Sequence, residues 1–277
     1  MKIKALFKAT CSAATVLALL SSPVWARDFS KLVILHTNDT HGYVEADADS
    51  CGLSVLPAIK KKYEDKGYQV LLLDAGDATQ DNQLANFSKG EFIIKLFNEL
   101  GYDAMTIGNH EFDFGLDNMA RVFRSLNFPI VCANYDFSNT PLDGVVKPYV
   151  ILHRKGLRIG VFGLCPVLDG LVDHKNYEPI RYEDPVEKAK EMVALLKAQR
   201  CDVIVCLSHL GWDIGGMDDE AVIARTEGID LVLGGHSHSY LQELAYVKNA
   251  KNQLVPVDQN GKHGIFIGKL ILSFQKK

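Results

Sequence analysis

The sequence predicts an α/β fold, and three observations support that prediction. In the first half of the chain, short runs rich in leucine and β-branched residues alternate with segments whose apolar residues recur at helical spacing. The second half adds hairpin signals between strands. Hydrophobic residues make up 47% of the 277 positions, an ordinary globular composition. Together these patterns predict one mixed sheet or two stacked sheets, with helices outside.

The first half contains four expected strands, at residues 31–35, 70–73, 104–107 and 130–133. Apolar residues at helical spacing predict helices at residues 52–66 and 116–126. A further helix is expected to begin at Ser88, because Glu91 stands three residues later as in a capping box. It should end near Gly101.

The second half begins with a predicted hairpin, in which Arg154-Lys155-Gly156 separates strands at residues 148–153 and 157–164. Asp184 and Pro185 are a typical start for a helix, expected to run to Gln199. Further expected strands are residues 203–207, 231–233, 254–257 and 264–274, with a short helix at 219–226. Without an internal repeat or linker, residues 27–277 are best described as one domain.

Residues 1–26 have the features of a secretory signal peptide. Three lysines precede a short apolar run from Ala13 to Leu20, and Val24-Trp25-Ala26 has the small residues typical of a cleavage site. The alternative is a retained membrane anchor, for which the run is too short and wrongly flanked. We expect an exported protein, periplasmic or secreted, that is cleaved near Ala26 and has no stable membrane insertion.

Charge and cysteine content exclude two classes of site. Loss of the three leader lysines leaves 27 basic against 34 acidic residues, a net charge of −7, which disfavours binding of a nucleic-acid polymer. Five cysteines remain after Cys11 is removed, and the absence of a CxxC pair disfavours a thiolate metal site. Cys201 and Cys206, five positions apart along one expected strand, cannot bridge each other. Buried free thiols are favoured, and the state of Cys132 and Cys165 stays open.

Five loops rich in Asp, Asn and His each follow an expected strand, at residues 38–42, 74–77, 107–113, 208–209 and 234–238. Taken singly, each has an ordinary explanation, such as a capping Asp or a hydrogen-bonded structural His. Five such loops, each after a strand, are better explained by one shared site than by five separate structural roles. Because the carboxyl ends of strands in an α/β sheet can meet at one edge, the loops are expected to converge on one site.

The residue types in these loops predict metal ions. Carboxylate, amide and imidazole ligands without sulfur suit a pair of divalent transition ions, such as Mn, Zn, Fe or Co. Imidazole suits the harder ions Mg and Ca less well. Two ions about 3.5–4 Å apart can clamp a phosphate oxygen and lower the pKa of a bound water that attacks phosphorus in line.

The order of the loops and the residues in them resemble those of a known family. Asp39-x-His41, Gly76-Asp77, Gly108-Asn109-His110-Glu111, His209 and Gly235-His236-x-His238 resemble the calcineurin-like metallophosphoesterases. The fuller forms, residues 38–42 and 108–113, are similar to the 5′-nucleotidase branch of that family, and the resemblance runs from about Leu32 to Phe274. It implies a four-layer αββα sandwich of two mixed sheets with flanking helices, and a metal site at the carboxyl ends of strands.

The resemblance also implies metal ligands position by position. One ion would be held by Asp39, His41 and His238. The other would be held by Asn109, His209 and His236, and Asp77 would bridge the two. Histidine at position 238 departs from the glutamine of well-known bacterial 5′-nucleotidase/UDP-sugar hydrolases, a difference expected to shift the metal preference without abolishing the site.

Four further positions receive roles. His110 would stand beside the phosphate and protonate the leaving oxygen or stabilise developing charge, and Asp113 would orient it. An alternative role for Asp113 is to cap the following helix. Glu111 is expected to be structural, and Asp74 to brace a ligand.

The sequence therefore predicts an exported dinuclear-metal phosphohydrolase acting on nucleotide 5′-phosphates or related small phosphate esters through metal-activated water. One alternative keeps the metals but changes the substrate to a phosphodiester, a UDP-sugar or a thiosulfate ester. Another class is a non-catalytic metal-containing subunit that partners a separate nucleotide-binding chain. Full-length bacterial 5′-nucleotidases have a second domain that binds the base. No part of this chain matches that domain, so a separate chain is a candidate to supply it.

Overall fold

The computed structural model describes residues 29–154 and 156–275 of the chain. The expected signal peptide, residues 1–26, lies outside the described residues. Within the described part, no helix combines the length and the apolar character needed to span a membrane.

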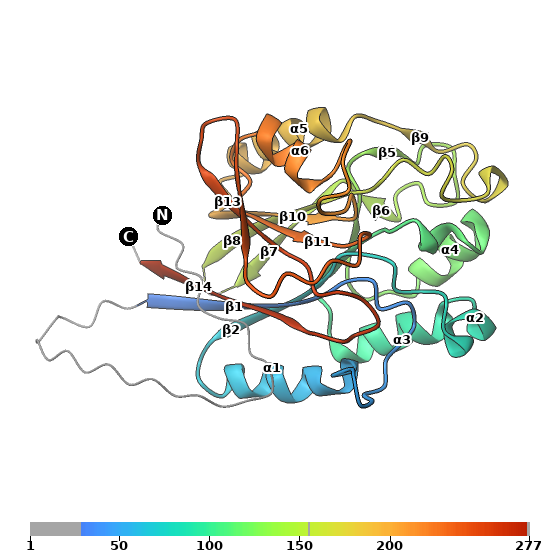
Figure 1. Ribbon diagram of the computed structural model, residues 1–277, viewed down its shortest axis with the longest axis horizontal. Coiled ribbons are helices and arrows are strands. Elements are labelled where there is room, and N and C mark those ends of the chain that lie inside the picture. The colour runs from blue at the N-terminus through green and yellow to red at the C-terminus, as the bar shows by residue number, and fades with distance from the viewer. Residues whose placement is uncertain (1–28, 155, 276–277) are drawn as a thin grey trace, which may run out of the picture.

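Two six-stranded sheets form the centre of the protein (Figure 1). The first has the order β14 (Gly268–Gln275), β1 (Phe29–Thr37), β2 (Gln69–Asp74), β3 (Ala104–Thr106), β4 (Ile130–Val131) and β6 (Val146–Lys147). Its strands run parallel except β14, which is antiparallel to β1. The carboxyl ends of β1, β2 and β3 therefore lie at the same edge of the sheet.

The second sheet is also parallel at its centre. Its order is β12 (Ala245–Lys248), β13 (Leu254–Asp258), β11 (Leu231–Gly234), β10 (Val203–Ser208), β8 (Leu157–Leu164) and β7 (Tyr149–Arg154). Only the outer strands β12 and β7 are antiparallel to their neighbours. A separate two-stranded sheet pairs β5 (Tyr135–Asp136) with β9 (Arg181–Tyr182).

Helices cover the outer faces of both sheets, which completes the expected αββα order of layers (Figure 1). The first sheet is covered from the side of α1 (Leu56–Glu64), α3 (Glu91–Leu100) and α4 (Gly115–Phe123), and the second from the side of α5 (Pro185–Ala198) and α6 (Asp219–Arg225). Shorter elements are α2 (Gln83–Ser88) and the 3₁₀ turns Leu53–Val55, His110–Phe112 and His174–Asn176.

Successive side chains of the central strands point to opposite faces of the sheet, and both faces are buried. In β1, Leu32 and Ile34 pack between the sheets, while Val33 and Leu35 pack toward the helices. All four side chains are fully buried. Strands buried on both faces have near-continuous hydrophobic runs, which is why these segments are apolar throughout rather than alternating.

Several expected elements are confirmed. Strands β7 and β8 form the predicted antiparallel hairpin. Helix α5 begins at Pro185, and the Asp184 carboxylate accepts hydrogen bonds from the backbone N–H groups of Val186 and Glu187. The thiol of Cys206 is buried and free, as expected. Those of Cys132 and Cys165, whose state the sequence left open, are also buried and free, while the free thiol of Cys201 is only partly buried.

The helix expected to begin at Ser88 is placed wrongly by the sequence. Ser88 is the last residue of α2, and its hydroxyl donates to Leu84 O at 2.8 Å. Lys89 and Gly90 then take left-handed φ values of 49° and 83°, so the chain turns before α3 begins at Glu91. Glu91 is thus the first residue of its helix, and no capping box forms.

Other corrections concern boundaries. The helix expected at residues 116–126 is α4, Gly115–Phe123, and the strand expected at 130–133 is only Ile130–Val131. The last strand begins at Gly268 rather than Gly264. The short strands β5, β6, β9 and β12 were not expected from the sequence.

Gly163 in β8 tests the contact between the two sheets. A Cβ added there would overlap the carbonyl oxygen of Val131 and the Thr106 hydroxyl, both in the first sheet. Gly163→Ala should therefore lower the free energy of unfolding by about 1–3 kcal/mol, the usual cost of overpacking, measured by urea denaturation.

The matched control is Gly160→Ala in the same strand. Its added Cβ would meet the Leu196 side chain at 2.8 Å, and a flexible side chain can move aside. A loss at position 163 no greater than at position 160 would contradict close packing of the sheets there.

Candidate metal centre

All five polar loops begin where a strand ends, and both sheets contribute. Residues 38–42 follow β1, Asp74 ends β2, and residues 107–113 follow β3 in the first sheet. Ser208 ends β10 and Gly234 ends β11 in the second. The loops meet at the common edge of the two sheets, so side chains almost 200 positions apart lie in contact.

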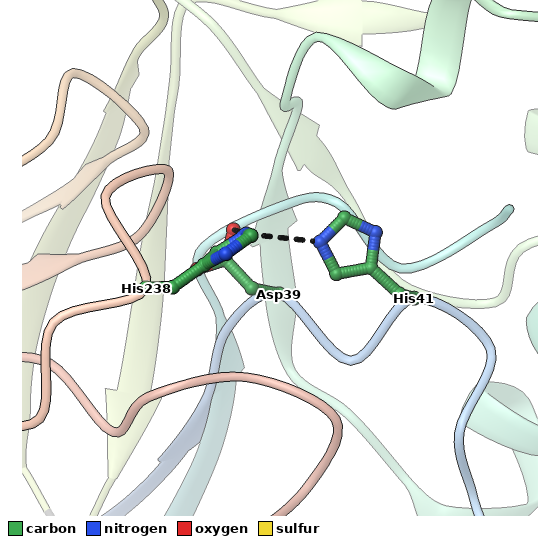
Figure 2. A group of neighbouring side chains, drawn as sticks. All are labelled: Asp39, His41 and His238. Carbon is green, nitrogen blue, oxygen red and sulfur yellow. Dashed lines mark hydrogen bonds and ion pairs between the residues drawn. The ribbon is translucent and has the colours of Figure 1, made fainter. Parts of the chain in front are cut away.

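One group of side chains comes from the first and last of these loops. Asp39 is fully buried, and the carboxylate Oδ1 lies 3.5 Å from His238 Nε2. His238 Nε2 lies 3.2 Å from His41 Nε2 (Figure 2). One potential ligand atom from each of the three lies within 4.8 Å of the others.

A second group lies beside the first. Asp77, His209 and His236 also bring potential ligand atoms within 4.8 Å of one another. Asp77 Oδ2 lies 3.0 Å from His209 Nε2, and Asn109 Oδ1 lies 2.9 Å from His236 Nδ1. Asp77 also forms a group of this kind with His41 and His110, so it stands between the two groups. All nine predicted site residues except Asp113 thus take part directly, and Asp113 contacts His110.

The electrostatics of the pocket favour a cation. Burial lowers the pKa of His41 and of His236 to about 4, so both imidazoles are neutral at pH 7 and keep a free ring-nitrogen lone pair. Burial also opposes the charged form of His209, but the nearby carboxylates of Asp77 and Asp39 outweigh it and raise its pKa to about 10. The negative potential that attracts a proton there would equally attract a divalent ion.

His209 also has the orientation of a metal ligand. Its Nδ1 lies 2.6 Å from the carbonyl oxygen of Ala75, which fixes the proton on Nδ1 in the neutral ring. The buried Nε2 faces both carboxylates, 3.0 Å from Asp77 Oδ2 and 3.8 Å from Asp39 Oδ1. An outer hydrogen bond that sets the tautomer and aims the other nitrogen is typical of ligating histidines. These residues therefore fit a pair of transition ions.

Five of the proposed ligands have a strained backbone. Asp39, His41, Asp77, His236 and His238 all have left-handed φ values, between 48° and 70°. Such conformations are uncommon for residues other than glycine and are maintained only where the surrounding structure holds them.

Glu111 holds two of these loops together. Its buried carboxylate accepts hydrogen bonds from four backbone N–H groups, those of Gly108, Asp77, Ala78 and Thr79, at 2.7–3.1 Å. The structural role predicted for Glu111 is thus a clamp between the loops after β2 and β3. The loops approach so closely that a Cβ on Gly108 would overlap the Asp77 carboxylate.

The described hydrogen bonds of Asp74 go to residues other than the proposed metal ligands, so the expected bracing of a ligand stays a prediction. Asp74 accepts a 2.5 Å hydrogen bond from the Thr37 hydroxyl and a 2.9 Å one from Gly76 N–H, which joins the ends of β1 and β2. Its complete burial raises its pKa to about 8.

His110 and Asp113 lie next to the two groups. Their Nδ1 and Oδ2 atoms are 2.9 Å apart, so the 3₁₀ turn at residues 110–112 brings the pair together. Phe114, not Asp113, occupies the position before α4, and Asp113 makes no cap there. Burial opposes the charged form of His110, but the Asp113 hydrogen bond and the Asp77 and Asp113 carboxylates raise its pKa to about 9.

Three further residues contact the centre, of which sequence reasoning missed Gln80 and His263 and gave Asn38 no role of its own. Gln80 Nε2 lies 2.5 Å from His110 Nδ1, and the Asn38 amide donates to Asp39 Oδ2 at 2.7 Å. The His263 ring centroid lies 5.6 Å from that of His41. The other residues were identified because they lie in polar loops directly after apolar strands. Gln80 and His263 do not directly follow a strand, so this pattern does not identify them.

A family model described as calcineurin-like phosphoesterase matches residues 32–240. The chain belongs to this family. The match covers all five polar loops, so it includes every side chain of the two groups described above.

Similar proteins include several 5′-nucleotidases. Snake venom 5′-nucleotidase of Gloydius brevicauda is 31% identical over 300 residues, covering 94% of this chain and 49% of that protein. The 5′-nucleotidase of Diplobatis ommata is 30% identical, covering 89% and 46%. The chain therefore spans about half the length of these relatives.

Solved structures agree with the fold. The 5′-nucleotidase precursor from Thermus thermophilus superposes with a TM-score of 0.81 at 30% identity, over 88% of this chain and 51% of that one. Calcineurin-like phosphoesterase YfkN from Bacillus subtilis gives a TM-score of 0.76 at 28% identity, over 90% and 87% of the two chains.

The clamp formed by Glu111 can be tested through stability. Glu111→Gln replaces one accepting oxygen with an NH₂ group that faces backbone donors. We expect a loss of about 1.5–3 kcal/mol in the free energy of unfolding of the metal-free chain, the usual value for hydrogen bonds to a charged group. Urea denaturation measures it.

Glu99→Gln is the matched control, because Glu99 is exposed on α3. Equal denaturation midpoints for the two variants would contradict the clamp.

Proposed function

We propose that this chain is an exported phosphohydrolase with two divalent metal ions, acting on nucleotide 5′-phosphates or related phosphate esters. The observation that carries the proposal is the convergence of seven potential ligand side chains beside His110, in a member of the calcineurin-like phosphoesterase family. Relatives named 5′-nucleotidase support the substrate class.

The proposed ligand sets follow the two groups of side chains. Asp39, His41 and His238 would hold one ion, Asn109, His209 and His236 would hold the other, and Asp77 would contribute to both. When bound, two ions in such a site supply positive charge to the phosphate and lower the pKa of a water molecule. The nitrogen-rich, sulfur-free donor set favours Mn, Zn, Fe or Co.

His110 is proposed to protonate the leaving oxygen. The Asp113 carboxylate engages Nδ1, which leaves Nε2 to carry the transferred proton. The Asp113 carboxylate, which is not among the proposed metal ligands, stabilises the protonated ring. About a third of the side chain is exposed, so a substrate can reach it.

The proposal includes a partner chain and export from the cytoplasm. A separate nucleotide-binding chain is the proposed partner, and the relatives named 5′-nucleotidase support a nucleotide as the substrate. The leader-like residues 1–26 support export to the periplasm or beyond.

The central test replaces His110. His110→Ala should lower kcat for p-nitrophenyl phosphate with Mn²⁺ by at least about 100-fold, because general acid catalysis typically contributes that much. Metal content should stay at the wild-type value, since His110 is not among the proposed ligands. His153→Ala, at an exposed position on β7, is the control. Wild-type protein that takes up metal but hydrolyses no phosphate ester would overturn the proposal.

The metal count is a separate prediction. Purified wild-type chain loaded with Mn²⁺ should contain two equivalents by elemental analysis. Asp77→Asn should lose affinity for both ions, because it removes the shared negative charge. Asp113→Asn should keep both. A wild-type stoichiometry of zero, or unchanged binding in Asp77→Asn, would contradict the shared role of Asp77.

A further inference from the structure

A hollow of about 720 Å³ lies beside the metal centre, between two short stretches of chain. One wall is residues 42–47, which follow His41. The other is residues 82–87, which include most of α2. Its volume lies within the range of about 300–1,000 Å³ that is usual for small-molecule sites. None of the residues that line it was given a role by the sequence.

Both walls of the hollow are joined to the metal centre through neighbouring residues of the chain. Gly42, in one wall, directly follows His41, and Asn82, in the other, donates its backbone N–H to His41 O at 3.1 Å. Gln80, two residues before Asn82, contacts His110 Nδ1. Since His110 is the proposed proton donor to the leaving oxygen, the leaving group would depart toward this hollow.

Both walls are held in place. Gly42 has a left-handed φ of 72°, and a Cβ there would lie 2.5 Å from the Ala85 Cβ, so α2 packs directly on the loop after His41. Tyr43 donates its backbone N–H to Thr40 O at 2.8 Å. Its ring stacks on His263 with centroids 4.0 Å apart. A ring fixed in this way is a preformed platform.

The lining combines exposed apolar side chains with two carboxylates. Phe87 is 93% exposed, and Leu84 and Tyr43 are also exposed. Glu45 and Asp47 add two exposed carboxylates. Among the described lining residues there is no basic side chain. The hollow is therefore unsuited to phosphate groups and suited to an uncharged ring that stacks on aromatic side chains.

We propose that this hollow binds an uncharged, planar aromatic leaving group, such as the base of a nucleoside monophosphate, with Tyr43 and Phe87 as its stacking residues. The proposal rests on the proposed function. Hydrolysis forms a bond from a water oxygen to phosphorus and breaks the phosphorus–ester oxygen bond. The ester oxygen takes a proton from His110, so the released product is a neutral nucleoside. The proton that the attacking water loses passes to solvent, from which His110 is protonated again. The chain would thus contain a base site of its own within the catalytic half.

The test compares two substrates in the metal-loaded protein. AMP carries an aromatic leaving group and glycerol 2-phosphate does not. Tyr43→Ala and Phe87→Ala should each lower kcat/KM for AMP roughly tenfold, mainly through KM, a size expected for loss of one stacking partner. For glycerol 2-phosphate the change should stay below about twofold. Tyr43→Phe should retain wild-type values for both.

Tyr246→Ala is the control, because Tyr246 is an aromatic residue on β12 that is 52% exposed and does not line the hollow. Equal losses for AMP and glycerol 2-phosphate, or no loss for AMP in either variant, would overturn the proposal. These results would instead fit a surface that a macromolecular partner covers.

Binding of adenosine to the metal-free chain, measured by calorimetry, separates this proposal from the proposed function. Wild-type protein should bind adenosine, and Tyr43→Ala and Phe87→Ala should weaken binding about tenfold. If the wild type hydrolyses neither ester yet binds adenosine through Tyr43 and Phe87, the hydrolase proposal fails and the base site stands. If hydrolysis occurs but adenosine binding is absent or independent of both residues, the base site fails alone.

Discussion

Two buried carboxylates, those of Asp39 and Asp77, set the main constraint on this structure. Each is at most 2% exposed and lies at the point where the two sheets share an edge. A carboxylate taken out of water is costly unless positive charge or hydrogen bonds replace its hydration. The structure supplies backbone N–H donors from His236 to Asp39 and from His110 to Asp77, together with the His209 ring. Divalent ions would neutralise the remaining charge.

The surrounding architecture follows from this requirement. Parallel strands in both sheets present their carboxyl ends at one edge, which allows loops from distant parts of the sequence to meet. Glu111 and Asp74 then fix the loops through backbone and hydroxyl hydrogen bonds. Five of the seven proposed ligands have left-handed backbone. The surrounding hydrogen bonds therefore hold these residues in a conformation that they would not adopt by local preference for negative φ. The layers of apolar side chains make the platform rigid enough to hold the strained loops.

Much of this was predictable from the sequence because it depends on local order. Each polar loop directly follows a strand with a clear apolar run, so its place at a sheet edge could be inferred for Asp39, Asn109 and His209. The resemblance to a family then implied how the side chains group. Asp184 predicted the start of α5 because the cap and Pro185 are adjacent in sequence.

The failures have physical causes as well. At Ser88 the serine–glutamate spacing matched a capping box, but left-handed backbone at Lys89 and Gly90 separated two helices there. Helix α2 buries only Ala85, too little apolar signal to predict it. Gln80 and His263 approach the centre through long-range packing, which no local pattern records. The hollow beside His41 also depends on such packing, since its two walls come from separate stretches of the chain, residues 42–47 and 82–87.

The most direct test of this account is the anomalous diffraction of crystals loaded with Mn²⁺. The account predicts two peaks about 3.5–4 Å apart. One should lie among Asp39, His41 and His238, the other among Asn109, His209 and His236, and Asp77 should reach both. A map with no peak at this edge of the sheets, or with ions only at other positions, would contradict it.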